Sequence, residues 1–122
     1  MKNIPLEIGK IGEEKAIVFL KNNGYKILDK NFRTRFGEID IIAEEKNDIV
    51  FIEVKTRTNY SFGVPQLAVD IKKQKKITKA ALHYIKIKNI SNKNFRFDVV
   101  AQINDKIELI KNAFTCPSIY NF

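Results

Sequence analysis

Two acidic residues lie within neighbouring segments that have the pattern of β-strands. Asp40 belongs to residues 37–43 (GEIDIIA), and Glu53 belongs to residues 49–55 (IVFIEVK). Apolar residues alternate along both segments, which is typical of strands that are buried on one face. The polar residues 45–48 between the segments predict a hairpin turn. We therefore expect the two acidic residues to lie on adjacent antiparallel strands.

The hairpin register predicts which side chains face each other. A turn centred on residues 46 and 47 places Asp40 directly across from Glu53. The other expected pairs are Ile39 with Val54, Ile41 with Ile52 and Ala43 with Val50 on an apolar face, and Glu38 with Lys55. Opposed side chains have Cβ atoms about 4.5–5.5 Å apart, and like charges in that position cost up to roughly 1 kcal/mol. We therefore expect a cation near the facing carboxylates.

A divalent metal ion would offset this repulsion. Mg²⁺ binds through one or two carboxylates and keeps its other positions for water and phosphate. Strand alternation places Lys55 on the same face as Glu53. A metal ion, carboxylates and an ammonium group at one place can orient water, stabilise developing negative charge and act on a phosphodiester. The competing interpretation is a solvated strand end whose charges neutralise one another, formed by Glu38, Asp40, Glu53 and Lys55.

A first helix is predicted for residues 7–22, and it ends near Gly24, which suits a left-handed C-terminal cap. Glu13 falls at the edge of the apolar stripe of this helix and could lean toward the strand face that carries Asp40. The alternative for Glu13 is an ordinary exposed helical glutamate. The residues that we expect to be buried are Ile8, Ile11, Gly12, Ala16, Val18 and Phe19.

A second helix is predicted from the cap Asp70 to about Lys88, and one of its faces is basic. The basic stripe consists of Lys72, Lys76, Lys79, His83 and Lys86. Such a stripe suits contacts with phosphate groups, and a solvated lysine face is the alternative.

Further strands are predicted at residues 25–34, 95–101 and 106–110. The first of them carries Arg33 toward the same end of the sheet as Asp40. The order helix, three strands, helix, two strands predicts a mixed sheet with helices packed on it. Arg96 and Asp98 share one face of their strand, so they either pair with each other or brace the site from a neighbouring strand.

The composition favours one globular domain, residues 1–122, with a polyanionic partner. The 22 Lys and Arg residues exceed the 14 Asp and Glu residues, which gives a formal net charge of +8 and indicates nucleic acid. No apolar run approaches the ~20 residues of a membrane helix, so we expect no membrane partner. The N-terminus lacks the pattern of a secretory signal and the chain has one cysteine, Cys116, so we expect a cytoplasmic protein. One Cys and one His also exclude a zinc site of four such ligands.

Several short motifs in this order resemble the YraN family, which comprises small bacterial proteins of undetermined role. The motifs are residues 12–16 (GEEKA), 31–33 (NFR), 37–40 (GEID), 51–57 (FIEVKTR), 62–65 (FGVP), 68–70 (AVD) and 96–100 (RFDVV). Asp40, Glu53 and Lys55 together also resemble the motif of the PD-(D/E)XK nucleases, to which the archaeal Holliday-junction resolvases are similar. The proline that gives this motif its name is absent, because Ile39 occupies its position.

The resemblance implies an α/β, restriction-endonuclease-like fold with a mixed sheet of about five strands. It implies that Asp40 and Glu53 hold Mg²⁺ or Mn²⁺ and that Lys55 positions or activates the attacking water. Glu13 matches the helical glutamate that completes such sites in the resolvases. The main-chain carbonyl of Val54 is a further candidate ligand.

We therefore expect a metal-dependent endonuclease that acts on DNA, with branched DNA among the candidate substrates, as a monomer or a symmetric homodimer. Phosphate contacts position DNA without reading its sequence. The residues expected to make them are Arg33, Arg57, Lys72, Lys73, Lys76 and Lys79. The alternative is a nucleic-acid-binding module of the same fold without independent catalytic activity, and metal binding discriminates between the two.

Overall fold

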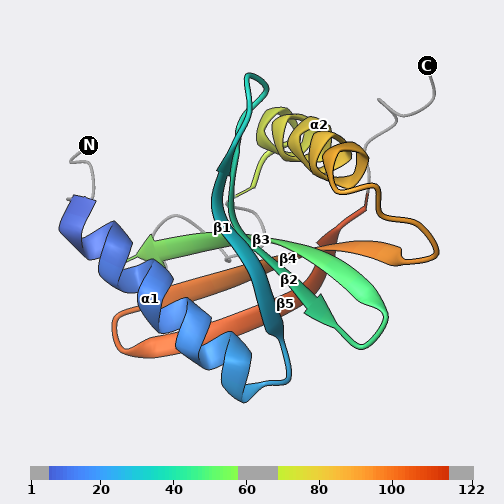
Figure 1. Cartoon of the computed structure of the whole chain (residues 1–122). Coiled ribbons are helices and arrows are strands. Elements are labelled where there is room, and N and C mark those ends of the chain that lie inside the picture. Colours follow the sequence, from blue (N-terminus) through green and yellow to red (C-terminus); the bar gives the residue numbers. More distant parts are fainter. Residues whose placement is uncertain (1–5, 58–68, 116–122) are drawn as a thin grey trace.

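The computed structural model describes residues 6–57 and 69–115, and these form two helices and five strands (Figure 1). The elements are α1 (Leu6–Asn22), β1 (Lys26–Arg33), β2 (Glu38–Glu45), β3 (Asp48–Arg57), α2 (Ile71–Ile87), β4 (Asn94–Ile103) and β5 (Lys106–Phe114). Their order is the one predicted from the sequence. Within the described residues, no helix is both long and apolar enough to cross a membrane.

The five strands form one mixed sheet in the order β1-β2-β3-β4-β5. Neighbouring strands are antiparallel except β3 and β4, which are parallel. Parallel neighbours need a crossover connection, and the chain between β3 and β4 contains α2. The predicted α/β architecture with a mixed sheet flanked by helices is confirmed.

Each helix covers a different face of the sheet, and each face has its own apolar core. Ala16 and Leu20 of α1 pack with Val50 and Ile52 of β3. On the other face, α2 packs with alternate residues of the same strand, among them Phe51. Strand alternation therefore directs the side chains of Glu53 and Lys55 toward the α2 side of the sheet.

Helix α1 approaches the sheet through its small residues, which differs from the predicted stripe. Ile11 and Val18 are 49% and 59% exposed, whereas Ala16 is fully buried. A Cβ atom at Gly12 would lie only 2.5 Å from Thr56 Oγ1, so a larger residue would force the Thr56 side chain or the helix to shift. The Gln102 side chain also donates a hydrogen bond to the carbonyl oxygen of Gly12. The prediction that Ile11 and Val18 are buried was wrong, because this close contact sets the rotation of the helix.

The β2–β3 hairpin has the predicted register near its turn and loses it farther on. Glu45 pairs with Asp48 across a two-residue turn, and the pairing continues to Ile41 and Ile52. Among the described residues, the pairs between these strands end there. Beyond that point β2 stays with β1 alone, and the two form a finger that projects from the sheet (Figure 1).

The separation of β2 from β3 overturns three predicted pairs, one of which is Asp40 with Glu53. Ile39 belongs to the core on the α2 side, whereas Ile41 belongs to the core on the α1 side, so the expected apolar pair of Ile39 with Val54 was wrong. Glu38 pairs with Arg33 of β1, so its expected partner Lys55 was also wrong. The strict alternation predicted for this segment ends where the strand changes partners.

Candidate active site

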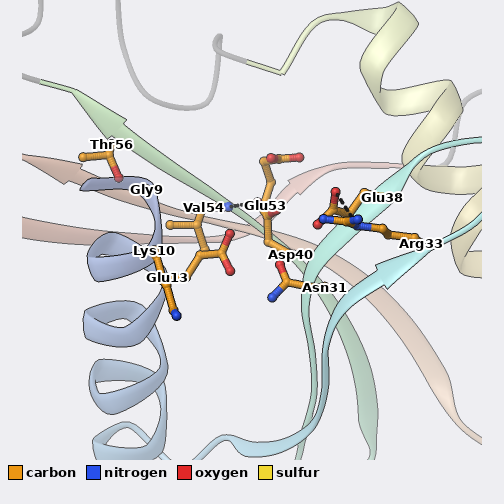
Figure 2. A pocket seen from close by; sticks show the side chains of 10 residues that line it. All are labelled: Gly9, Lys10, Glu13, Asn31, Arg33, Glu38, Asp40, Glu53, Val54 and Thr56. Atoms are coloured by element: carbon orange, nitrogen blue, oxygen red, sulfur yellow. Dashed lines mark hydrogen bonds and ion pairs between the residues drawn. The ribbon is translucent and has the colours of Figure 1, made fainter. Parts of the chain in front are cut away.

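The predicted acidic residues line an open cleft at the point where β2 and β3 separate (Figure 2). Side chains from α1, β1, β2 and β3 contribute to it. The lining residues are Gly9, Lys10, Glu13, Asn31, Arg33, Glu38, Asp40, Glu53, Val54 and Thr56. The fold therefore brings Glu13, Asp40 and Glu53 to one place from three different elements.

Asp40 lies at the centre of the cleft, where it holds the two strands together after their ladder has ended. Its Oδ2 atom accepts a hydrogen bond of 2.9 Å from the main-chain N–H of Val54. This contact fixes the Asp40 carboxylate beside Glu53 without a direct cross-strand pair. The predicted convergence of the two carboxylates is thus present, although the predicted ladder pair is not.

Glu53 is the buried member of the pair, with 7% of its surface exposed. Burial is the largest cause that raises the pKa of Glu53, to about 8, and the adjacent Asp40 carboxyl adds to it. A carboxyl group placed this way resists ionisation unless a cation enters the cleft. Perturbed carboxyl groups in a cleft are typical of functional sites.

Two lysines act on Glu53 from the α2 side. Lys73 Nζ lies 3.8 Å from Glu53 Oε2, and the Lys73 side chain is 43% exposed. Both Lys73 and Lys55 work to lower the pKa of Glu53, but burial outweighs them. Lys55 is partly buried and is not among the described residues that line the cleft. The structure therefore places Lys55 near Glu53, as predicted, and adds Lys73.

Glu13 faces the cleft from α1, one residue after the close contact at Gly12. Burial raises the pKa of Glu13, followed by the negative charges of Asp40 and Glu38. With its amide nitrogen turned toward the carboxylates, Asn31 donates hydrogen bonds to Glu13 (3.0 Å) and Glu38 (3.2 Å). Glu13 is thus a cleft residue and not an ordinary exposed glutamate.

Sequence reasoning gave no role to Asn31 or Lys10, which also line the cleft. Asn31 has a left-handed backbone with φ of 53°, a conformation that asparagine adopts more readily than most residues. Its place in the NFR motif beside Arg33 was the signal that could have revealed it. Lys10 lies one helical turn before Glu13, so the same helix face predicts its position.

The predicted phosphate-binding residues differ in their place and exposure, and of the described ones Arg33 lines the cleft. The Arg33 side chain is 79% exposed and lies 3.5 Å from Glu38. Arg57 ends β3, but its side chain lies outside the described residues. The exposed lysines of α2 extend the basic surface away from Lys73, and they are Lys72, Lys76 and Lys79.

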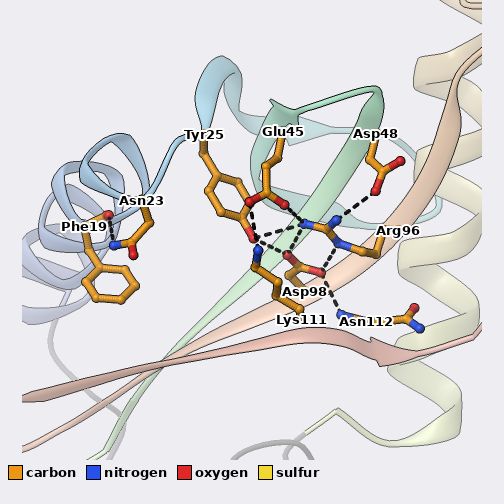
Figure 3. A network of polar contacts seen from close by, with 9 residues as sticks. All are labelled: Phe19, Asn23, Tyr25, Glu45, Asp48, Arg96, Asp98, Lys111 and Asn112. Atoms are coloured by element: carbon orange, nitrogen blue, oxygen red, sulfur yellow. Dashed lines mark hydrogen bonds and ion pairs between the residues drawn. The ribbon is translucent and has the colours of Figure 1, made fainter.

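Arg96 and Asp98 lie at the other end of the hairpin and pair with each other (Figure 3). Arg96 also binds Glu45 and Asp48, each at 2.8 Å. The hydroxyl group of Tyr25 donates to Asp98 and accepts from Arg96. Of the two interpretations of this pair, the structure supports mutual pairing in a structural network.

The cleft provides oxygen atoms of the kind that Mg²⁺ and Mn²⁺ prefer. Within the described ranges, no group of three His, Cys, Asp or Glu side chains is gathered closely enough to hold a metal ion. Asp40 and Glu53 alone satisfy the one or two carboxylates that Mg²⁺ requires, with water and phosphate completing its shell. The donor set therefore fits a hard divalent ion, and the role of Glu13 as a further ligand stays a prediction.

Comparisons with known proteins agree with the motifs. A family model described as "Uncharacterised protein family UPF0102" matches residues 12–102. A UPF0102 protein of Clostridium botulinum (strain Kyoto / Type A2) is 54% identical over 115 residues, covering 88% of this chain and 94% of that protein. A UPF0102 protein of Persephonella marina is 48% identical over 106 residues, covering 87% of this chain and 91% of that protein.

Among solved structures, the chain is similar to the crystal structure of a repair endonuclease from Pyrococcus abyssi. The TM-score is 0.42 and the sequence identity is 19%. The match covers 86% of this chain and 42% of that one, so the chain spans less than half the length of that endonuclease.

Proposed function

The chain belongs to the UPF0102 (YraN) family, and we propose that it is a metal-dependent endonuclease that hydrolyses phosphodiester bonds in DNA. The observation that carries this proposal is the meeting of Asp40 and Glu53 in an open cleft at the separation of β2 and β3, with Glu13 opposite them. Two carboxyl groups held together beside a basic surface suit a metal ion and a polyanionic substrate.

In this proposal Asp40 and Glu53 hold Mg²⁺ or Mn²⁺, with Glu13 and the Val54 carbonyl as additional ligands. When bound, the ion supplies Lewis-acid stabilisation and lowers the pKa of water. The N–H of Val54 keeps the Asp40 carboxylate in place before any substrate arrives, which is the preorganisation that catalysis requires. Lys55 positions the attacking water beside the scissile phosphate.

The cations around the cleft orient the DNA. Lys73 is already beside Glu53, so its ammonium group is placed to contact the scissile phosphate. Arg33, Arg57 and the exposed α2 lysines bind flanking phosphates, which fixes the backbone without selecting a sequence. Branched DNA is the first substrate class to test, and a symmetric homodimer is the form suited to cutting two strands.

The test is cleavage of supercoiled plasmid and of a four-way junction with Mg²⁺ or Mn²⁺. We expect Asp40→Ala and Lys55→Ala to lose at least about 100-fold in rate, in the range typical of removing one group that stabilises charge in a transition state. Glu14→Ala is the matched control, because Glu14 is an exposed acid on α1 beside Glu13 and its removal should leave the rate unchanged. Equal cleavage by wild type, Asp40→Ala and Lys55→Ala would remove the catalytic proposal.

A second candidate is a nucleic-acid-binding module without activity of its own. The lack of a three-ligand group among the described residues, together with the exposed lysines of α2, favours it. DNA affinity that falls steeply with salt but needs no metal ion would support this candidate. Binding of one Mn²⁺ ion by the cleft would count against it.

A further inference from the structure

A second hollow lies away from the carboxylates, between the tip of the β1–β2 finger and α2. Its residues combine a phenyl ring, an exposed leucine and several basic groups. They are Phe36, Lys79, Leu82, His83 and Lys86. Leu82 is 38% exposed, so the floor of the hollow is apolar and open to solvent.

The tip of the finger is a hydrogen-bonded turn that lies against α2. The Thr34 hydroxyl group accepts hydrogen bonds from the N–H groups of Phe36 (3.0 Å) and Gly37 (3.2 Å). The Thr34 N–H donates to the Gly37 carbonyl oxygen at 2.9 Å. A Cβ atom at Gly37 would lie 3.2 Å from Lys76 Cβ, so the glycine lets the tip lie directly on the helix. Phe36 is thus presented by a fixed turn.

Cations already surround the Phe36 ring. The Arg35 guanidinium carbon lies 5.0 Å from the ring centroid, and Lys79 Nζ lies 5.8 Å from it. His83 is within 6.4 Å of the neighbouring Phe32 ring, centroid to centroid. An aromatic face among basic side chains is the arrangement that binds an unstacked base together with its phosphate.

We propose that this hollow binds an unpaired nucleobase of the DNA, stacked on Phe36, with its phosphate held by Lys79 and Lys86. The inference rests on the proposed function, since it names the class of DNA that the cleft receives. The substrate class is therefore DNA that carries an unpaired base.

The test measures binding without any divalent ion, so it is independent of cleavage. One DNA probe is a fully paired duplex, and the other carries a single unpaired 2-aminopurine in one strand. The wild-type protein should bind the second probe more tightly and quench its fluorescence, because the base stacks on the ring. Phe36→Leu retains apolar bulk but loses the aromatic face, and it should reduce the preference roughly 5- to 150-fold, the range seen for loss of one stacking contact.

Matched variants separate stacking from charge and folding. Phe36→Tyr keeps the ring and should keep the preference. Phe95→Ala removes another exposed aromatic residue, outside this hollow, and should also keep it. Lys79→Ala should weaken the binding of both probes. The salt dependence of binding should fall by the amount that corresponds to about one phosphate contact.

Two outcomes would overturn the inference. One is equal binding of both probes by wild type, and the other is an unchanged preference and quenching in Phe36→Leu. Because no metal ion is present, neither outcome depends on whether the cleft hydrolyses DNA. Loss of cleavage in Asp40→Ala with no preference for the unpaired base would keep the proposed function and reject the hollow as a base-binding site.

Discussion

The two ends of the β2–β3 hairpin both gather carboxylates, but their cations lie at different distances. The turn is the matched end, where the ion pairs are short, and the cleft is the unmatched end, where Lys73 lies 3.8 Å from Glu53 and Arg33 lies 3.5 Å from Glu38. At the turn, Arg96 binds Glu45, Asp48 and Asp98 at 2.8–2.9 Å. Lys111 adds a contact of 2.8 Å to Glu45. Each carboxylate there has a hydrogen-bonded positive partner, and the network closes the hairpin.

The pKa directions differ between the two ends. Burial acts to raise the pKa of Glu45, but hydrogen bonds from Lys111 and Arg96 outweigh burial and lower it. Burial also acts on Glu53, and there the neighbouring Asp40 adds to it, so that the pKa rises to about 8. The pKa values of two glutamates on one hairpin are therefore shifted in opposite directions.

The difference separates a structural network from a site held ready for a ligand. Buried charges that are fully paired serve the fold, and removing one partner leaves the others unpaired. Carboxylates that are held together without sufficient cations make the cleft a place that gains stability when a cation binds. We attribute the function to the unmatched end for this reason.

The largest expected effect on stability is at the matched end. Arg96→Met leaves the fully buried Asp98 without its cation, and we expect the free energy of unfolding to fall by about 3–5 kcal/mol. Arg33→Met is the control, because that side chain is 79% exposed and its loss should change stability by less than about 1 kcal/mol. Urea unfolding measures both. Comparable stability of the two variants would mean that the Arg96 network is not structural.

At the unmatched end, we expect a substitution to stabilise the metal-free protein. Folded Glu53 retains its proton up to about pH 8, whereas its ordinary value is 4.5, so the folded state binds more protons in this window and stability falls as pH rises through it. Glu53→Gln removes this fall in stability, because glutamine does not titrate. At pH 8 it should be more stable than wild type by over ~1.4 kcal/mol, which one pKa unit represents.

The pH series of urea unfolding checks the sign. The gap between Glu53→Gln and wild type should open between pH 4.5 and about 8, while Glu45→Gln should be less stable than wild type at neutral pH. A gap that is constant with pH would show that Glu53 is not held protonated.

The smallest effect is expected for Lys73, which lies beside Glu53. Lys73→Met removes a partly exposed ion pair of 3.8 Å, so the free energy of unfolding should change by less than about 1 kcal/mol. DNA affinity should fall equally for all sequences, with a smaller salt dependence. A fall of several kcal/mol in stability would instead place Lys73 among the structural ion pairs.

Local patterns in the sequence predicted much of this arrangement. Three such features depend only on neighbouring residues: the hairpin turn, the order of the elements and the helix cap Asp70. The Asp70 Oδ1 atom accepts a hydrogen bond of 2.8 Å from the Lys73 N–H. The register from Ile41 to Asp48 follows from the turn alone.

The missed features depend on contacts between distant segments. Alternation along β2 cannot show that residues 38–40 lie outside the pairing with β3, because that separation accompanies the β1–β2 finger and its contact with α2. The rotation of α1 depends on Thr56 and Gln102 against Gly12. The spacing of Gly12 and Ala16, one helical turn apart, was a signal for a close approach that outweighs the larger apolar residues.

The most direct test of the account is calorimetric titration of the protein with Mn²⁺. Wild type should bind one ion in the cleft, and Asp40→Asn should lose this binding. Asp48→Asn, which removes a carboxylate from the matched end of the same hairpin, should retain it. Failure of wild type to bind Mn²⁺, or equal binding by Asp40→Asn, would contradict the assignment of the cleft as a metal-dependent active site.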